Sequence, residues 1–519
     1  MGSRHTDIQN SSEIIRQNVL IFIVSYNADS TIAAVLSRIP SELFHDTNVH
    51  VEVLIIDDGS SDNTIAECRR FSQHNPDMPL TILVNPENMG YGANQKLGYR
   101  YAINQGFDIV CLLHGDGQYA PEELPNLLRP LLRGECEAVF GSRMMEAGAA
   151  LMGGMPTYKY YGNKILTWLQ NNIVGTNLSE YHSGYRLYSV HALHSLPFEY
   201  NSNGFDFDTD IIIQLHNAGY RILEIPIPTF YGDEICHVNG IPYAANILFS
   251  CLASRMQNLS LFYNRKFDLQ SDNEQYQPKF DFYSSHSLAL HAVNAHERLL
   301  ILGCGSSALV APFAKKGCRF SVLDKYISLE LEALSDYCAG VNLNEFDLRD
   351  LPPDLSNDTV LALDIIEHLV FPEHFLENLR QAASTRESRL ILTTPNVTFL
   401  PLRIMFLLGF FNYGKRGILD RTHTRLFTFG SLQRVLRQAG FDIISMKGIP
   451  APFPLALGRT SRIGKFLLET NRMLIQIWPS GFSYQIYCEA KPTPTLDELL
   501  GRTLEHSTQT IPSNDIVRC

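Results

Sequence analysis

The sequence predicts an α/β protein made of two doubly wound, Rossmann-like domains joined by one polar linker. A chain of 519 residues is too long for one ordinary hydrophobic core. Short apolar runs alternate with helical stretches along most of it, which is typical of parallel sheets covered by helices. The alternation lapses once and then starts again. We therefore assign a first domain to residues 18–266, a linker to 267–285 and a second domain to 286–490, with a disordered tail at 1–17 and another tail at 491–519.

The first domain begins with a buried strand that starts at Val19 and leads into a helix from about Asp29. Strands are predicted next over VEVLIIDDGS, LTILVN and FDIVCLLHGDG. EAVFGSR is a further strand, and Tyr158 to Gln170 is a helix. The segment DTDIIIQLHNAG is predicted as a helix and RILEIPI as a strand. This order favours one parallel sheet with helices between its strands.

The polar, proline-containing run DLQSDNEQYQPKF marks the linker. After it, RLLILGCGSS is a strand that runs into a loop of small residues, and ALVAPFAKKG is a helix that stops at Gly317. Three more strands are predicted over RFSVLD, TVLALD and RLILTTPN, followed by an amphipathic helix over SLQRVLRQAGF. The second series therefore predicts a second α/β sheet.

Charge and cysteine content exclude some classes of protein. The formal net charge of −12 argues against a nucleic-acid partner, because such partners need a basic surface. Ten cysteines are scattered without a CxxC pair, and the start does not resemble a secretory signal. This pattern favours reduced thiols in the cytoplasm over a disulfide frame or a zinc site.

Two apolar segments are candidates for membrane spans, Tyr243 to Tyr263 and Val397 to Tyr413. Arg255 interrupts the first and Arg403 the second, so neither is expected to cross a bilayer. Packing inside the protein and a membrane-surface or substrate-facing lid both remain open for them. A lipid-linked substrate would bring the chain to the cytoplasmic face of a membrane without a spanning helix.

Polar residues follow several predicted strands of the first domain. Ser25, Tyr26 and Asn27 follow the first strand, and Asp57 and Asp58 follow the second. His114, Gly115, Asp116, Gly117 and Gln118 follow the fourth. Ligands of parallel α/β sheets bind at such strand ends. Carboxylates there can accept hydrogen bonds from a nucleoside or hold a divalent cation against a diphosphate.

The segments VLIFIVSYNADSTI, VLIIDDGSSDNT, NMGYGANQKLGYRYA and HGDGQYAPEEL together resemble a family 2 glycosyltransferase with the GT-A fold. The nearest branch is that of the dolichyl-phosphate mannosyltransferase-like and polyprenyl-phosphate sugar transferases. The resemblance implies a nucleotide-sugar donor and Mg²⁺ or Mn²⁺. It implies that Asp116 is the primary metal ligand, with Gln118 and His114, where the family often has Asp, as further ligands. It also implies a donor site formed by Tyr26, Asp57, Asp58, Asn88 and Gly90.

Four further residues match the family's catalytic positions. Arg143, in GSR, resembles its basic residue near the diphosphate or acceptor, and Arg186, in SGYRLYS, is expected to face phosphate oxygens. Asp208 and Asp210 lie near the family's acidic position at a helix start, where an acid also stabilises the helix dipole. Asp210 is the preferred base for a hydroxyl acceptor. A polyprenyl-phosphate acceptor is already an anion and needs no base.

The second domain opens with a strand ending at Gly303, Cys304 and Gly305, where small residues let a ligand approach the backbone. Asp324, Asp347 and Asp364 lie at or near the ends of later predicted strands. This ordered set resembles a class I methyltransferase of the ubiquinone-biosynthesis O-methyltransferase type. The resemblance implies that S-adenosylmethionine binds at the two glycines and Cys304, with Asp324 on its ribose and Asp347 beside its adenine.

The second domain departs from that family at Ile301, where an Asp is usual, and at Ser307, where a glycine is usual. A domain that binds without turnover, as a scaffold, is therefore the alternative. If it is active on a hydroxyl, His368 or His423 could take the proton, and each has a structural role as its alternative. The leading interpretation is a bifunctional enzyme that transfers a sugar to a lipid-phosphate or glycan acceptor and methylates a sugar or related acceptor.

Overall fold

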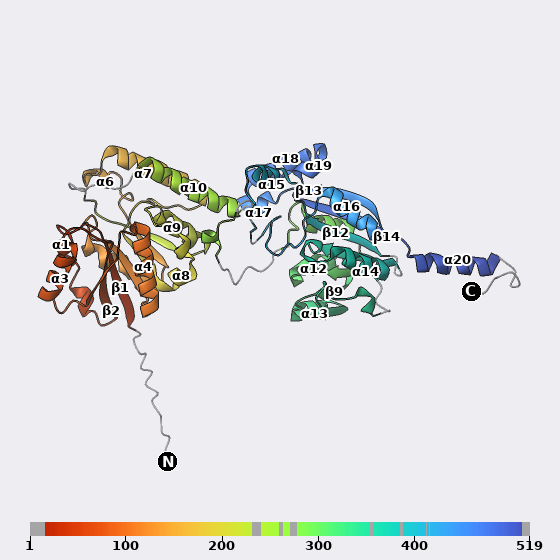
Figure 1. Cartoon of the computed structure of the whole chain (residues 1–519), viewed down its shortest axis with the longest axis horizontal. Coiled ribbons are helices and arrows are strands. Elements are labelled where there is room, and N and C mark those ends of the chain that lie inside the picture. The colour runs from red at the N-terminus through yellow and green to blue at the C-terminus, as the bar shows by residue number, and fades with distance from the viewer. Residues whose placement is uncertain are drawn as a thin grey trace, which may run out of the picture. The chain divides into compact units, whose positions relative to one another are not determined.

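The computed structural model describes residues 16–230, 240–258, 263–269, 278–352, 357–384, 388–411, 413–414 and 416–510. The described chain folds into two compact units (Figure 1). The described residues of 16–257 and 263–269 belong to the first unit, and those of 278–510 to the second. Most of the expected N-terminal tail, residues 270–277 of the expected linker and the end of the expected C-terminal tail lie outside the described residues.

The first unit is built on a seven-stranded sheet with the order β3-β2-β1-β4-β6-β5-β7. β6 runs antiparallel to both β4 and β5, so the sheet is mixed and not purely parallel as expected. The short strand β6 was not predicted as a strand, because it lies inside the run SGYRLYS. The strands are β1 (Gln17–Ser25), β2 (Val49–Asp57), β3 (Leu80–Val84), β4 (Ile109–His114), β5 (Ala138–Ser142), β6 (Arg186–Ser189) and β7 (Ile222–Pro226).

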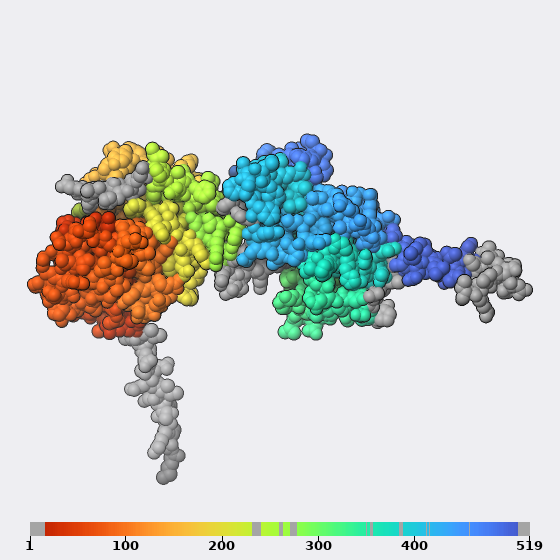
Figure 2. Space-filling view, in the orientation of Figure 1, coloured from red at the N-terminus to blue at the C-terminus, as the bar shows by residue number. Residues whose placement is uncertain are grey.

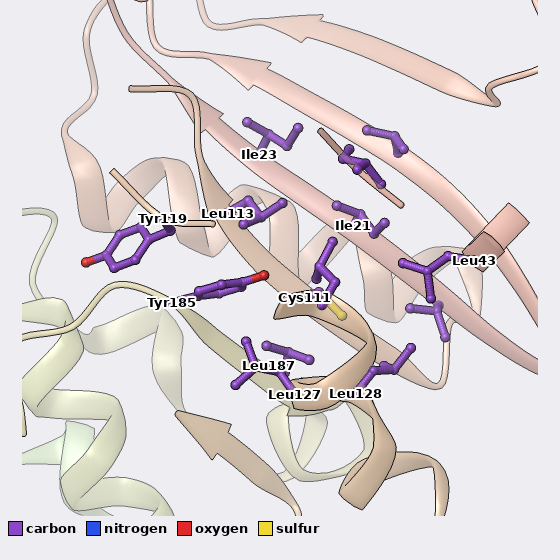
Figure 3. Packing of buried hydrophobic residues seen from close by; sticks show 14 of the residues in the cluster. Ile21, Ile23, Leu43, Cys111, Leu113, Tyr119, Leu127, Leu128, Tyr185 and Leu187 are labelled. Atoms are coloured by element: carbon purple, nitrogen blue, oxygen red, sulfur yellow. The ribbon is translucent and has the colours of Figure 1, made fainter. Parts of the chain in front are cut away.

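Two hydrophobic clusters cover the two faces of this sheet, as a doubly wound fold requires. Side chains of β1 alternate between them: Ile21 and Ile23 enter one cluster, and Leu20 and Phe22 the other. Figure 3 shows the first cluster, where β1 and β4 side chains meet Leu127 and Leu128. The helices are α1 (Ile32–Ser37), α2 (Glu42–His45), α3 (Thr64–His74), α4 (Tyr91–Gln105), α5 (Leu124–Leu132), α6 (Ala149–Met152), α7 (Thr157–Val174), α8 (Val190–Ser195), α9 (Phe207–Asn217) and α10 (Gly240–Asn258).

The second unit has another seven-stranded sheet, with the order β10-β9-β8-β11-β12-β14-β13. Its first five strands are parallel, and β14 runs antiparallel to β12 and β13. Hydrophobic clusters again cover both faces. The strands are β8 (Arg298–Leu302), β9 (Arg319–Asp324), β10 (Tyr337–Gly340), β11 (Thr359–Leu363), β12 (Arg389–Pro395), β13 (Phe441–Ile449) and β14 (Gln485–Pro492).

Helices of the second unit extend into the residues that we expected to be a tail. α20 occupies most of 491–519 and exposes Leu496 and Leu504, whose spacing of eight residues suits one face of a helix. Among the described residues, no helix is both long and apolar enough to cross a bilayer. The helices are α11 (Ser285–Ala292), α12 (Ser307–Lys315), α13 (Leu329–Leu334), α14 (Pro372–Ser384), α15 (Leu400–Leu407), α16 (Phe429–Gln438), α17 (Phe453–Leu457), α18 (Arg462–Ile477), α19 (Pro479–Phe482) and α20 (Leu496–Thr510).

Candidate functional site

The first candidate site lies where the strand order of the first sheet reverses, at the carboxyl ends of β1 and β4. β2 and β4 flank β1 on its two sides, and Ser25, Asp57 and His114 end these three strands. Such a reversal leaves a crevice between the loops that follow the central strands, where ligands of open α/β sheets bind. The fold therefore brings together the polar strand ends that the sequence singled out.

Asp57 and Asp58 hold the loops around this crevice. The carboxylate of Asp57 accepts hydrogen bonds from the backbone N and the hydroxyl of Ser60, at 2.9 and 2.5 Å. The carboxylate of Asp58 accepts from the backbone N of Met89 and Gly90, at 3.0 and 2.9 Å. Both acids are buried, so each shapes the rim of the expected donor site through bonds within the protein.

The segment before α4 closes tightly on the chain ahead of α9. Gly90 has φ of 97°, and a Cβ there would lie 2.7 Å from the carbonyl oxygen of Asn203, so no other residue fits without strain. Asn88 is exposed beside it, and Tyr26 is exposed at the end of β1. Both side chains are therefore accessible to a ligand, as the donor-site prediction requires.

Asp116 is the accessible acid of this site. Its side chain is 45% exposed, and its carboxylate accepts a hydrogen bond from the backbone N of Gln118 at 3.0 Å. The Nδ1 atom of His114 lies 4.0 Å from a carboxylate oxygen of Asp116. Burial lowers the pKa of His114, although Asp116 and Asp208 raise it, so the imidazole is neutral at pH 7. These groups suit a divalent cation, which prefers carboxylate and neutral imidazole ligands.

A hydrogen-bond chain from α9 orients His114. The hydroxyl of Tyr91 donates to Asp208 at 3.3 Å and lies 3.1 Å from Nε2 of His114. When the Tyr91 hydroxyl donates its hydrogen bond to Asp208, it accepts a hydrogen bond from the N–H at Nε2 of His114. The lone pair of Nδ1 then faces Asp116. Tyr91 and Asp208 thus fix the orientation of the His114 ring beside Asp116. The sequence did not single out Tyr91, because only the fold places α4 against α9.

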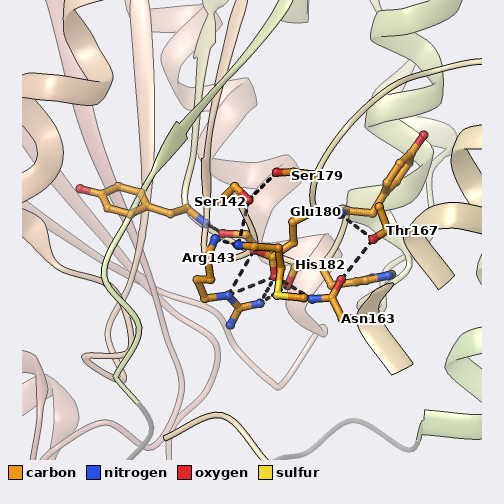
Figure 4. A network of polar contacts seen from close by, with 12 residues as sticks. Ser142, Arg143, Asn163, Thr167, Ser179, Glu180 and His182 are labelled. Carbon is orange, nitrogen blue, oxygen red and sulfur yellow. Dashed lines mark hydrogen bonds and ion pairs between the residues drawn. The ribbon is translucent and has the colours of Figure 1, made fainter. Parts of the chain in front are cut away.

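Arg143 is buried in an ion pair (Figure 4). Its side chain is paired with Glu180, whose carboxylate also accepts from the backbone N of Arg143 at 2.7 Å and from Asn163 at 2.8 Å. Burial alone would raise the pKa of Glu180, but the Arg143 charge and these hydrogen bonds outweigh it and lower that pKa. Since Glu180 neutralises it, Arg143 does not offer a free charge to a diphosphate. Glu180 lies in no sequence motif that could have identified it as the partner of Arg143.

Arg186 does not lie where we expected it, facing phosphate oxygens. It is only 1% exposed, and its guanidinium donates to the backbone carbonyl oxygens of Ser183, Tyr181 and Asp208 at 2.7, 2.7 and 3.0 Å. The Asp208 carboxylate lies 3.7 Å away. These bonds fasten the loop before β6 to the start of α9, so Arg186 has a structural position.

Asp210, our preferred base, is fully buried and also structural. Its carboxylate binds Nζ of Lys266 at 2.7 Å and accepts from the backbone N of Ser202 at 3.1 Å. Burial raises the pKa of Asp210, with Lys266 and Ser202 acting in the opposite direction. A group enclosed in this way is not placed to take a proton from an acceptor.

The second candidate site lies at the carboxyl ends of β8, β9 and β11. Gly303 and Gly305 have φ of 68° and 69°, which lets the backbone turn sharply after β8. The carboxylate of Asp324 accepts from the backbone N of Gly305 at 2.8 Å and of Tyr326 at 3.1 Å. Cys304 is buried, and burial raises the pKa of its thiol to about 12, so it is an inert part of the loop. The turn and the acid therefore lie together, as a nucleoside-bearing cofactor requires.

Two further acids lie beyond this turn. Asp364 follows β11 in a left-handed conformation, with φ of 56°. Its carboxylate accepts from Thr393 at 2.7 Å and from Gln485 at 2.8 Å, which fixes it at the strand end. Asp347 is half-buried ahead of a short helical turn over Leu348–Asp350. Its place beside an adenine stays a prediction.

Glu367, His368 and His423 form a group that could hold a metal ion, since their ligand atoms lie within 4.8 Å of one another. Glu367 is buried, and its carboxylate oxygens lack a hydrogen-bond partner among the described residues. Burial and Asp364 raise its pKa well above the usual value. Nδ1 of His368 and of His423 lie 3.2 and 2.9 Å from backbone carbonyl oxygens. Among the described residues, Nε2 of each ring has no hydrogen-bond partner, so it can act as a ligand or base.

Two family models match this chain. Residues 20–196 match the model described as glycosyl transferase family 2, and residues 267–446 match one described as a methyltransferase domain. They fall on the two series of strands that carry the two candidate sites.

Relatives and solved structures resemble one part of the chain. Polyprenol monophosphomannose synthase of Mycolicibacterium smegmatis is 26% identical over 42% of this chain and 79% of its own. Undecaprenyl-phosphate mannosyltransferase of Micrococcus luteus is 28% identical over 42% of this chain and 85% of its own. A crystal structure of glucosyl-3-phosphoglycerate synthase from Mycobacterium tuberculosis with uridine diphosphate is 18% identical, with a TM-score of 0.35, over 48% of this chain and 87% of that one. The chain thus carries a family 2 glycosyltransferase domain in its N-terminal half and a methyltransferase domain in its C-terminal half.

Proposed function

We propose that the chain is a bifunctional transferase. Its first unit moves a sugar from a nucleotide-sugar to a polyprenyl-phosphate or related glycan acceptor, and its second unit methylates a sugar or related acceptor with S-adenosylmethionine. The observation that carries this proposal is that each unit has its own site at the carboxyl ends of its strands. Asp116 beside His114 lies in one, and Asp324 against the Gly303–Gly305 turn lies in the other.

A lipid phosphate is the acceptor that fits the first unit best. Such a nucleophile is already an anion, so the enclosure of Asp210 by Lys266 is no obstacle to the reaction. The names of the two mannosyl-transferring relatives support this acceptor class. α7 and α10 also carry outward apolar stripes at helical spacing, which suit a membrane surface. The stripes are Tyr158, Tyr161, Ile165 and Trp168 on α7, and Ile241, Phe249, Leu252 and Met256 on α10.

Asp116, with His114 and Gln118, would hold the Mg²⁺ or Mn²⁺ that this family implies. The exposed carboxylate and the neutral imidazole fit a divalent cation. Such an ion neutralises negative charge on a departing diphosphate when it is bound. Tyr26 and Asn88 lie exposed at the same rim, where they would contact the donor.

In the second unit, S-adenosylmethionine would supply the methyl group, and Gly303, Gly305 and Asp324 would hold it. His368 or His423 would accept the proton of a hydroxyl substrate through its free Nε2. The competing function is a scaffold that binds without turnover. Ile301 favours it, since this position lies in the buried core of β8 and offers no carboxylate to the cofactor.

Thermal stabilisation of the purified chain tests both halves together. A ligand that binds the folded state raises its melting temperature. UDP-, GDP- and dTDP-sugars with Mn²⁺ and S-adenosylhomocysteine are tested separately. A shift with one nucleotide-sugar names the donor. If no nucleotide-sugar shifts the melting temperature, the sugar-transfer proposal is refuted. If S-adenosylhomocysteine does not shift it, the methyl-transfer half is refuted.

Replacement of Asp324 by alanine is expected to weaken S-adenosylhomocysteine binding by about a hundredfold, since a carboxylate that hydrogen-bonds a ligand contributes roughly 1.5–3 kcal/mol. Isothermal titration measures the Kd. Asp358→Ala is the matched control, because this acid also adjoins β8 but binds the surface residue Arg298. Equal affinity in both variants would remove Asp324 from the cofactor site.

Replacement of Tyr91 by phenylalanine is expected to weaken Mn²⁺ binding by about ten- to a hundredfold, because the groups behind a metal-ligating histidine fix its orientation. The free Mn²⁺ signal in electron paramagnetic resonance, recorded in the presence of UDP, measures the affinity. Tyr101→Phe on the same helix serves as the control. Unchanged affinity in Tyr91→Phe would show that His114 does not act as a ligand through this hydrogen-bond chain.

A further inference from the structure

α18 carries a buried stripe on one side and an exposed apolar stripe on the opposite side. Gly464, Leu468, Asn471 and Ile475 are buried against the unit. Ile463, Phe466, Met473 and Ile477 are between 63% and 79% exposed. With 3.6 residues per turn, each set forms one stripe, and the two stripes face opposite directions. A helix at the surface of a protein normally presents polar residues outward, so the exposed apolar stripe indicates a binding surface.

The apolar surface continues from α18 to α15. Trp478 directly follows α18, and the guanidinium of Arg403 on α15 lies 5.0 Å above its ring. The hydroxyl of Thr398, just before α15, donates to the backbone carbonyl of Ser480 at 3.0 Å. Figure 2 shows both segments at the outer surface of the second unit, α15 in cyan and α18 in blue. We call the exposed apolar side chains of these helices and of the residue that directly follows each helix the outer face: Ile404, Leu407, Leu408, Ile463, Phe466, Met473, Ile477 and Trp478.

Positive charge flanks the outer face. Residues 399–411 and 453–482 contain five arginines and lysines and one acid, in a chain whose net charge is −12. Two of these cations are paired, Arg472 with Glu469 and Arg459 with Asp281, which lies outside the two ranges. Arg462 and Lys465 are exposed beside the apolar stripe of α18. An apolar stripe edged by cations is complementary to a bilayer that contains anionic lipids, because its alkyl chains accept the stripe and its head groups pair with the cations.

We propose that the outer face docks the methyltransferase unit on a membrane containing anionic lipids. α18 lies in the plane of the membrane, with Phe466 and Ile477 among the alkyl chains and with Arg462 and Lys465 at the head groups. The tryptophan at the end of the helix suits the boundary between head groups and alkyl chains. This docking depends on α15 and α18 alone and not on which sugar or acceptor the chain uses. It implies that the unit meets its methyl acceptor at a membrane surface.

Binding of the full chain to vesicles tests the proposal with two neighbouring substitutions. Ile477→Asp places a charge in the outer stripe, and Gln476→Asp places the same charge one residue away, off the stripe. Partition onto vesicles of phosphatidylglycerol and phosphatidylcholine is expected to fall by roughly ten- to a hundredfold in Ile477→Asp. It is expected to change by less than about fivefold in Gln476→Asp, the effect of one charge near the surface. Arg462→Gln with Lys465→Gln is expected to abolish the preference for phosphatidylglycerol over pure phosphatidylcholine.

The same measurement separates this face from the stripes of the first unit. Phe249→Asp on α10 alters only the first unit, so a loss confined to that variant would overturn the proposal. Equal partition of Ile477→Asp and the unsubstituted chain would overturn it as well. A dimer that dissociates in Ile477→Asp, seen by analytical ultracentrifugation without lipid, would assign the outer face to a second copy instead. Unchanged melting temperatures of the variants show that folding is not the cause of any loss.

Discussion

Replacing Asp116 with asparagine is expected to lower kcat/KM for sugar transfer by about a thousandfold or more, which corresponds to roughly 4 kcal/mol of transition-state stabilisation. The carboxylate is accessible at the end of β4 and, among the described residues, accepts one hydrogen bond, from the backbone N of Gln118. Its charge is therefore free for a cation. Stability is expected to change by less than about 0.5 kcal/mol, because the side chain is 45% exposed.

Transfer of a radiolabelled sugar to a short polyprenyl phosphate measures this effect. Glu122→Gln is the matched control, because it also removes an exposed carboxylate close to the same loop, one that pairs with Arg38 at the surface. The control is expected to keep full activity. If Asp116→Asn also keeps it, the metal assignment is wrong, whereas loss in both variants would point to a general effect of surface charge.

Much of the fold was predictable because hydrophobic pattern determines it. The buried runs at β1, β2, β4, β8, β9, β11 and β12 lie where their sequences placed them. β6 was missed, since four residues inside a polar run leave too little periodicity to read. β10, β13 and β14 were not predicted as strands. The antiparallel pairing of β14 with β12 and β13 arises from packing and not from local pattern.

The candidate sites show the same division. Asp116 and the Gly303–Gly305 turn could be located because the chemistry resides in a local run at a strand end. The buried ion-pair partners could not be located from the sequence. Arg143 and Glu180 are 37 residues apart, and only the packing of α7, β5 and the loop before β6 joins them. Asp210 and Lys266 are 56 residues apart. A motif shows that an arginine or an acid is present, but only the fold shows whether another charge already neutralises it.

Whether a buried arginine is structural or acts on a ligand can be measured at Arg186. Replacing it with methionine is expected to destabilise the first unit by about 3–5 kcal/mol, because the substitution leaves the Asp208 carboxylate buried beside an uncharged side chain and breaks three hydrogen bonds to backbone carbonyls. Arg38→Met removes an exposed pair with Glu122 and is expected to cost less than about 1 kcal/mol.

Hydrogen exchange at the amides of β4 and β5 reports the opening free energy of the first unit separately from that of the second. The structural position of Arg186 predicts faster exchange in Arg186→Met and unchanged exchange in Arg38→Met. In Arg186→Met, sugar-transfer activity is expected to fall in proportion to the fraction of molecules whose first unit is unfolded. If Arg186→Met instead keeps native exchange and loses activity, the arginine acts on the donor phosphates as the sequence first suggested, and the buried ion pair with Asp208 must open during the reaction.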